Sequence, residues 1–152
     1  MIKIKLEDSH IIINDNSRSK KSILEKISDI LSEPSGIKKS IIFNTLYERE
    51  KLGSTSVGKG VALPHARVND IDYPFVCIII LDEPIDFDNI DNLDVDIILS
   101  IIVPADNFDN HLELLAYFSE KLDDPKIRRE LRKARNSEQI LKNFASDNIE
   151  FI

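Results

Sequence analysis

The segment FVCIIIL, residues 75–81, decides the class of fold because it is apolar on both faces. Such a strand suits the interior of a sheet that is covered on both sides. The segment VDIILSIIVP, residues 95–104, has the same character and predicts a second buried strand. Two shorter strands are predicted beside them: an edge strand in the β-branched run at residues 10–13, and a strand at residues 59–64 that leads to His65.

Helical periodicity accounts for much of the remaining chain. Ser19 suits the N-cap of a helix over residues 20–33, which EPSG at residues 33–36 then ends. Further helices are predicted over residues 38–51, from Asp109 or Asn110 onward, over 126–134 and over 138–144. The expected core face of the helix at 38–51 consists of Ile41, Ile42, Leu46 and Tyr47.

These elements alternate without a long linker, an internal repeat or a segment of low complexity. We therefore predict an α/β fold in which helices flank both faces of a mixed, roughly five-stranded β-sheet. A chain of 152 residues suits one domain and is long enough to bury a substantial core. We expect this single domain to cover residues 1–152, with its core at about 10–146.

Composition excludes several classes of function. The net charge of −7 argues against nucleic-acid binding, which needs a basic surface. The longest apolar runs fall far short of the roughly 20 residues that span a bilayer. No charged-then-apolar leader opens the chain, so we expect a cytoplasmic protein without direct membrane insertion. The single cysteine, Cys77, allows neither an internal disulfide nor a thiolate zinc cage, and we expect it to be buried and structural.

The segment GSTSVGKGVALPHAR, residues 53–67, holds three of the chain's four glycines just before His65. Glycine loses much conformational freedom on folding, so a cluster of glycines needs a reason. Tight turns alone would explain it. A backbone that approaches a ligand closely beside a reactive side chain is the other explanation, because glycine has no Cβ in the way.

Three histidines are candidates for chemistry. His10 has no polar cluster around it and is expected to be an ordinary residue at a surface or strand edge. His65 follows a proline at the end of a predicted strand, where α/β proteins place reactive groups. His111 opens a helix that Asn110 can cap, with Glu113 in the capping-box position. For His65 and His111, an ordinary surface imidazole is the alternative interpretation.

The residues around His65 do not fit several kinds of catalysis. GSTSVG lacks the pattern of a serine-hydrolase elbow, and GKGV lacks the Ser or Thr of a Walker loop. A metal site would need a third ligand, and Asp109 is explained equally well by helix capping. Attack of a neutral imidazole on phosphorus remains compatible, because a phosphoimidazole is labile and transferable. Arg49 could offset the phosphoryl charge, although a solvated charge at a helix end is the alternative.

His111 is expected to be neutral near pH 7. A histidine in the first turn of a helix lies at the positive end of the helix field, which disfavours its charged form. We therefore expect His111 to donate a hydrogen bond and not to serve as a second phosphate acceptor.

Three blocks of the sequence resemble one known family: REKLGSTSVGKGVALPHAR, LDEPIDFDNIDNLDVDIILSIIVPADNFDNHLELLA and KLDDPKIRRELRKARNSEQI, which begin at residues 49, 81 and 121. The resemblance is to the type 2 enzyme IIA domain of the bacterial phosphotransferase system (PTS), the fructose/mannitol class. It spans about residues 19–144, and it is strongest toward the nitrogen-regulatory branch, IIA-Ntr.

The resemblance implies a role for each of three residues. His65, the histidine of the PH pair, would be phosphorylated on Nε2. His111 would be the second active-site histidine, and Arg49 would contact the phosphoryl group. This chain has Ala66 and Arg67 where the family usually has glycine and lysine. Arg67 keeps the charge, whereas Ala66 would be costly if its position needed a positive φ.

The resemblance also implies partners, and no cofactor or metal. A histidine phosphocarrier protein of the HPr or NPr kind would phosphorylate the chain. A regulatory protein of this branch would then act on sensor kinases or potassium transport components. A sugar-specific IIA component, which passes the phosphoryl group to a IIB domain of a permease, is the first alternative. A binding module that is not phosphorylated and a His-ligated metal protein are the others.

Overall fold

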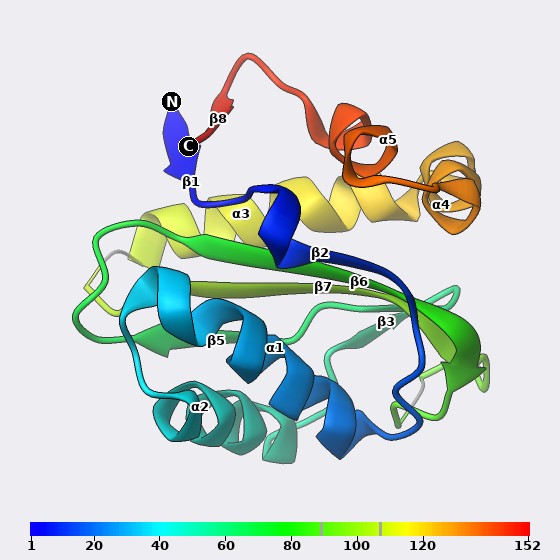
Figure 1. The fold of residues 1–152 in the computed structure, drawn as a ribbon, viewed down its shortest axis with the longest axis horizontal. Coiled ribbons are helices and arrows are strands. Elements are labelled where there is room, and N and C mark those ends of the chain that lie inside the picture. The colour runs from blue at the N-terminus through cyan, green and yellow to red at the C-terminus, as the bar shows by residue number, and fades with distance from the viewer. Residues whose placement is uncertain (89, 107) are drawn as a thin grey trace.

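The structure, a computed structural model, describes residues 1–88, 90–106 and 108–152, and at residues 108 and 109 the backbone alone. Within these residues a six-stranded sheet lies between two layers of helices (Figure 1). The predicted α/β class, with helices on both faces of a mixed sheet, is confirmed. The strand count exceeds the rough estimate of five because the chain before and after His65 forms several short strands.

The two apolar strands expected inside the sheet pair with each other. They are β6 (Phe75–Ile85) and β7 (Val95–Pro104), and their antiparallel register runs from Phe75↔Ile102 to Ile85↔Val95. All of β7 is buried except the half-buried Asp96. This burial on both faces explains why the sequence of β7 is apolar at successive positions instead of alternating.

Shorter strands extend the sheet on either side of this pair. β2 (Ile11–Asp15) runs parallel to β6 and forms one edge, as predicted for the run at residues 10–13. On the other side, β4 (Val61–Ala62) and β5 (His65–Val68) both run parallel to β7 in one continuous register. β3 (Ser56–Gly58) pairs antiparallel with β4 and forms the second edge.

A separate two-stranded sheet joins the ends of the chain. Its strands, β1 (Ile2–Ile4) and β8 (Ile149–Phe151), are parallel and lie above the α3 layer in Figure 1. Two 3₁₀ turns, η1 (Asp8–His10) and η2 (Lys142–Phe144), lead into β2 and follow the last helix.

The alternation of side chains along β6 divides the core into two layers. Val76, Ile78 and Ile80 pack with the apolar residues of one helical layer, and Cys77, Ile79 and Leu81 pack with those of the other. The first layer contains α3 (Phe108–Asp123), α4 (Pro125–Lys133) and α5 (Ser137–Leu141), and the second contains α1 (Lys20–Ser35) and α2 (Lys39–Lys51).

The predicted start of α1 is confirmed, and its end lies two residues beyond the predicted residue 33. The Ser19 hydroxyl accepts a hydrogen bond from the backbone N–H of Ser22, which satisfies one of the free donors at the helix start. The helix ends within EPSG, and Gly36 closes it in the left-handed conformation with φ 75°.

The predicted core face of α2 is partly wrong. Ile42 and Leu46 are buried, but Ile41 is 48% and Tyr47 43% exposed. The third buried residue of the stripe is Glu50, which lies one further turn along the helix. Glu50 therefore continues the buried stripe of the helix, although its charge favours an exposed position.

The expectation that His10 is a surface or strand-edge residue is also wrong. His10 ends the turn η1 and is only 1% exposed, with its ring centroid 6.4 Å from that of Phe75. The single 3₁₀ turn between β1 and β2 directs the ring inward. Burial lowers the pKa of His10, although the Glu7 carboxylate acts against this shift.

The glycines before His65 shape a tight hairpin. Gly58 and Gly60 flank the turn between β3 and β4 with φ of 91° and 82°, values that favour glycine. A Cβ on Gly60 would lie 2.5 Å from the Arg132 guanidinium, which pairs with Asp96. At Gly60, therefore, the missing side chain makes room for this internal ion pair, and the space is not left open to a partner.

No helix in the described part of the chain is both long enough and apolar enough to cross a membrane.

Cys77 is fully buried in β6, and burial raises the pKa of its thiol. We predict that a thiol reagent such as DTNB labels the native protein only at the rate of global unfolding, because the thiolate is the reactive form. The measurement is a time course of labelling, with the urea-unfolded protein as the control that reacts at once. Rapid labelling of the native protein would contradict a structural role.

Candidate functional site

The structure brings together the two histidines that the sequence singles out. His65 is the first residue of β5 and His111 is the fourth residue of α3, yet their ring centroids lie 5.4 Å apart at an interplanar angle of 62°. One ring therefore presents its edge to the face of the other.

His65 occupies a break between two strands. β4 ends at Ala62 and β5 begins at His65, although both strands keep the same register along β7. Pro64, which lacks an N–H, separates them, and its carbonyl accepts a hydrogen bond of 3.0 Å from the N–H of Ile101. The break therefore leaves the backbone anchored to β7 on either side of the reactive residue.

A hydrogen bond fixes the tautomer of the His65 ring. Its Nδ1 lies 2.8 Å from the Leu63 carbonyl oxygen. A carbonyl can only accept, so Nδ1 carries the proton and donates. In the neutral ring the lone pair is then on Nε2, which is the nitrogen available for nucleophilic attack.

Arg49 lines the same cavity as His65. This cavity has a volume of about 370 Å³, and its walls include the segment 54–57 on one side and Leu115, Ala116 and Ser119 of α3 on the other. The guanidinium of Arg49 donates a hydrogen bond of 3.0 Å to the carbonyl of Gly53. Arg49 is therefore anchored at the edge of the cavity that contains His65.

His111 is deeper than the sequence predicts. Because α3 begins at Phe108, Asn110 lies inside the helix and is not its N-cap, and Glu113 is not in a capping-box position. His111 is 7% exposed. Within the described parts of the chain, its Nδ1 is enclosed and has no hydrogen-bond partner.

Both histidines are neutral near pH 7. Burial, followed by the charges of His65, Arg67 and Arg49, lowers the pKa of His111 to about 4. Burial is thus the main cause of the lowered pKa of His111, whereas the sequence analysis attributes the neutral ring to the field of the helix. The pKa of His65 is also lowered, mainly by burial; the hydrogen bond to Leu63 opposes the shift and the charge of Arg49 adds to it.

The structure answers the question that Ala66 raises. Ala66 lies within β5, where it pairs with Ile102, and it is not among the residues with positive φ. Its small side chain is 5% exposed and packs in the core. A glycine is therefore not required at this position, and alanine carries no strain from left-handed geometry.

Sequence reasoning misses one group beside the site. Glu50, next to Arg49, is buried and accepts hydrogen bonds from both the N–H and the hydroxyl of Thr55. Its spacing from Ile42 and Leu46, which places all three on one helical face, was the feature that could have revealed it.

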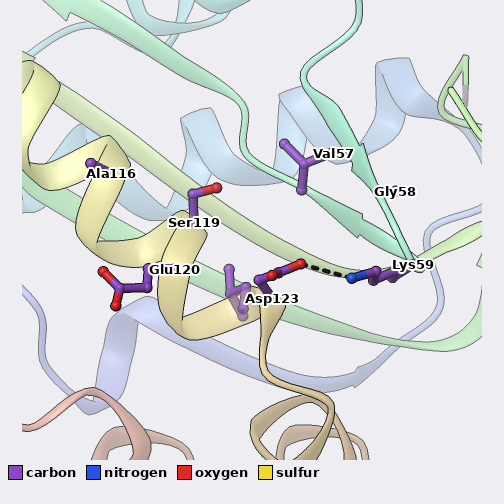
Figure 2. A pocket seen from close by; sticks show the side chains of 8 residues that line it. Val57, Gly58, Lys59, Ala116, Ser119, Glu120 and Asp123 are labelled. Atoms are coloured by element: carbon purple, nitrogen blue, oxygen red, sulfur yellow. Dashed lines mark hydrogen bonds and ion pairs between the residues drawn. The ribbon is translucent and has the colours of Figure 1, made fainter.

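A second cavity of about 310 Å³ adjoins the first (Figure 2). The two share Val57, Ala116 and Ser119, and the far end of the second is bridged by an ion pair of 2.8 Å between Lys59 and Asp123. Neither histidine nor cysteine is among the residues that line this second cavity.

The sequence leaves open a metal site with a third ligand beside the two histidines. In the part of the chain whose side chains the structure describes, no group of three or more His, Cys, Asp or Glu is arranged to hold a metal ion. The side chain of Asp109, the third ligand considered, lies outside that part. The His65–His111 pair alone falls short of the ligand number of a zinc site.

The chain belongs to the family described as the phosphoenolpyruvate-dependent sugar phosphotransferase system, EIIA 2, whose model matches residues 5–146. It is therefore a PTS IIA component. The same fold is found in the enzyme IIAMTL of Escherichia coli, in its complex with phosphorylated enzyme IIBMTL, with a TM-score of 0.79 at 17% identity over 93% of this chain and 97% of that one.

Within the family, the chain is similar to nitrogen regulatory proteins. It is 38% identical to the one of Klebsiella oxytoca, with 81% of this chain and 76% of that protein covered. It is 37% identical to the one of Pseudomonas aeruginosa, with 85% and 84% covered. The crystal structure of IIA-Ntr from Neisseria meningitidis matches with a TM-score of 0.88 at 32% identity, over 91% of this chain and 95% of that one.

We predict that His111 stays neutral throughout the range pH 5–8. Its pKa in the folded protein, about 4, lies below the ordinary value of 6.5. Between these values the unfolded chain binds more protons, so His111 makes the protein less stable as the pH falls. NMR titration of the ring measures the pKa, and urea unfolding of His111→Ala should show a weaker loss of stability in acid. A pKa of His111 near 6.5 would refute the prediction.

Proposed function

We propose that this IIA component accepts a phosphoryl group on Nε2 of His65 from the phosphohistidine of a phosphocarrier protein. The tautomer of His65 carries the proposal. Its Nδ1 donates to the Leu63 carbonyl, which leaves the Nε2 lone pair in the ring that lines a cavity with Arg49. In the transfer, the lone pair forms the new N–P bond while the N–P bond of the donor breaks, and its electrons return to the donor imidazole.

Arg49 and His111 would stabilise the transferred group. Phosphoryl transfer depends mainly on positioning and on offsetting the charge of the equatorial oxygens. The guanidinium of Arg49 can hold two of these oxygens at once. The neutral ring of His111, 5.4 Å from that of His65, can donate one hydrogen bond.

We further propose that phosphorylation regulates other proteins. The similarity to proteins named nitrogen regulatory protein supports this choice. The phosphoryl group would add about two negative charges to the surface around His65, and a partner such as a sensor kinase or a potassium transport component would respond to that charge. The chain would act in the cytoplasm, where its donor is found.

Transfer to a IIB domain is the second candidate function. The chain is 27% identical to a fructose-specific EIIA component of Haloferax volcanii, over 86% of its length. Incubating the phosphorylated chain with purified fructose- and mannitol-type IIB domains separates the two functions. Transfer to a IIB domain at a rate comparable to that of phosphorylation of the chain itself would favour sugar transport and count against a purely regulatory role.

His65→Ala and His111→Ala should differ in kind. His65→Ala removes the acceptor atom, so we predict no labelling. His111→Ala should still be phosphorylated on His65, but 10- to 100-fold more slowly, which corresponds to the loss of one charge-assisted hydrogen bond of about 1.5–3 kcal/mol. The measurement is a rapid-quench time course with a phosphorylated histidine phosphocarrier protein as donor. Labelling of His65→Ala would show that these roles are wrong. So would an equal loss of labelling in His65→Ala and His111→Ala when both variants are folded.

Arg49→Lys should fold normally and accept the phosphoryl group on the order of 10-fold more slowly than the wild type. Lysine keeps the charge but cannot hold two oxygens in a fixed fork. The same time course gives the rate, and circular dichroism checks the fold. If Arg49→Lys and the wild type were phosphorylated at the same rate, Arg49 would be only a surface charge.

A further inference from the structure

Glu50 is a buried carboxylate one residue from Arg49. Its side chain is 3% exposed at the C-terminal end of α2. One carboxylate oxygen accepts the N–H of Thr55 at 3.1 Å, and the other accepts the Thr55 hydroxyl. The ammonium of Lys20 lies 2.9 Å away. Burying a carboxylate is costly unless it is paired and hydrogen-bonded, and the contacts with Thr55 and Lys20 supply both.

The partner lysine is itself fixed. Lys20 lies in the first turn of α1, 3.1 Å from the carboxylate of Asp88 and 5.0 Å above the centroid of the Phe87 ring. Although burial lowers the pKa of Lys20, its hydrogen bonds with Glu50 and Asp88 raise it overall. The ion pair therefore joins the start of α1 to the end of α2 as a charged unit.

Glu50 and Arg49 hold the same short segment of chain. Gly53 follows the end of α2, and the next residues, 54–57, form one wall of the cavity that contains His65. Glu50 binds Thr55 in this segment, and Arg49 donates to the carbonyl of Gly53. Ser54 completes the attachment by donating to the carbonyl of Phe87 at 2.7 Å. The acceptor that anchors the Arg49 guanidinium therefore lies two residues from the point at which Glu50 fixes the backbone.

We propose that Glu50 is a positioning residue for phosphoryl transfer: by binding Thr55, it holds residues 53–56 in place and so holds the Arg49 guanidinium beside His65. The inference rests on the proposed function, because it assigns Glu50 to the reaction of His65. Glu50 does not contact the phosphoryl group in this proposal. Its effect reaches the reaction through Thr55, Gly53 and Arg49.

The first test is Glu50→Gln. Glutamine keeps the shape and one oxygen acceptor but loses the charge that binds Lys20 and strengthens the bonds to Thr55. We expect His65 to be phosphorylated on the order of 10-fold more slowly at saturating phosphorylated carrier, with little change in the carrier concentration at half-maximal rate. Glu48→Gln is the matched control. Glu48 flanks Arg49 on the same helix, but it is 67% exposed and pairs only with Lys51 among the described residues.

A double-mutant cycle with Arg49→Lys distinguishes positioning from a general loss of stability. If Glu50 acts through the guanidinium, adding Glu50→Gln to Arg49→Lys should slow transfer much less than it slows the wild type. Independent, multiplicative effects of the two substitutions would overturn the proposal. If Glu50→Gln does not fold, Thr55→Val takes its place in the cycle, because it removes the hydroxyl that Glu50 accepts and keeps the charge.

The titration of His65 supplies a readout that packing alone would not change. The charge of Glu50 raises the pKa of His65, against the larger effect of burial. Glu50→Gln should therefore lower the pKa of His65 further, and the acid limb of the rate profile should move to lower pH. An unchanged pKa of His65 would contradict the influence of the Glu50 charge on this ring.

These measurements distinguish failure of the proposed function from failure of the role proposed for Glu50. If the wild type is never labelled on His65, the proposed function fails. If the wild type and Glu48→Gln are labelled and Glu50→Gln matches their rate, only the role of Glu50 fails.

Discussion

The antiparallel pairing of β6 with β7 is the constraint on which the rest of the structure depends. Residues 75–81 of β6 and all of β7 except Asp96 are buried between the two helical layers, so these apolar sequences can be accommodated only inside the sheet. Because β6 covers one side of β7, the other side remains for β4 and β5, and this side carries His65. His65 is therefore attached to a strand that is buried along almost its whole length, while its own ring reaches a surface cavity.

The electrostatics of the site follow from this partial burial. Burial is the largest cause that lowers the pKa of both His65 and His111, and the nearby charge of Arg49 acts in the same direction. Neutral rings suit the proposed nucleophile and hydrogen-bond donor, and the guanidinium of Arg49 suits the proposed phosphoryl group. If the proposed function holds, the site is organised before the phosphoryl group arrives, so little rearrangement is needed for the transfer.

The buried pair of Lys20 and Glu50 extends this organisation into the scaffold. It ties α1 to α2 and fixes the segment that forms a wall of the cavity. A pair of similarly placed apolar residues could serve packing equally well, since buried ion pairs contribute little net stability. The oriented hydrogen bonds of Glu50, unlike apolar packing, fix the position of the backbone beside Arg49.

The sequence by itself determined the strands at residues 75–81 and 95–104, the Ser19 cap, the α/β class and the family, because these depend on local periodicity and on contiguous motifs. His65, His111 and Arg49 could also be selected, since they lie in or beside such motifs. Only the tertiary structure decided that His10 is buried, that Asn110 does not cap α3, and that Glu50 faces inward. Each of these depends on which surface another element covers, and the local pattern of the chain does not show which distant segment a side chain will meet.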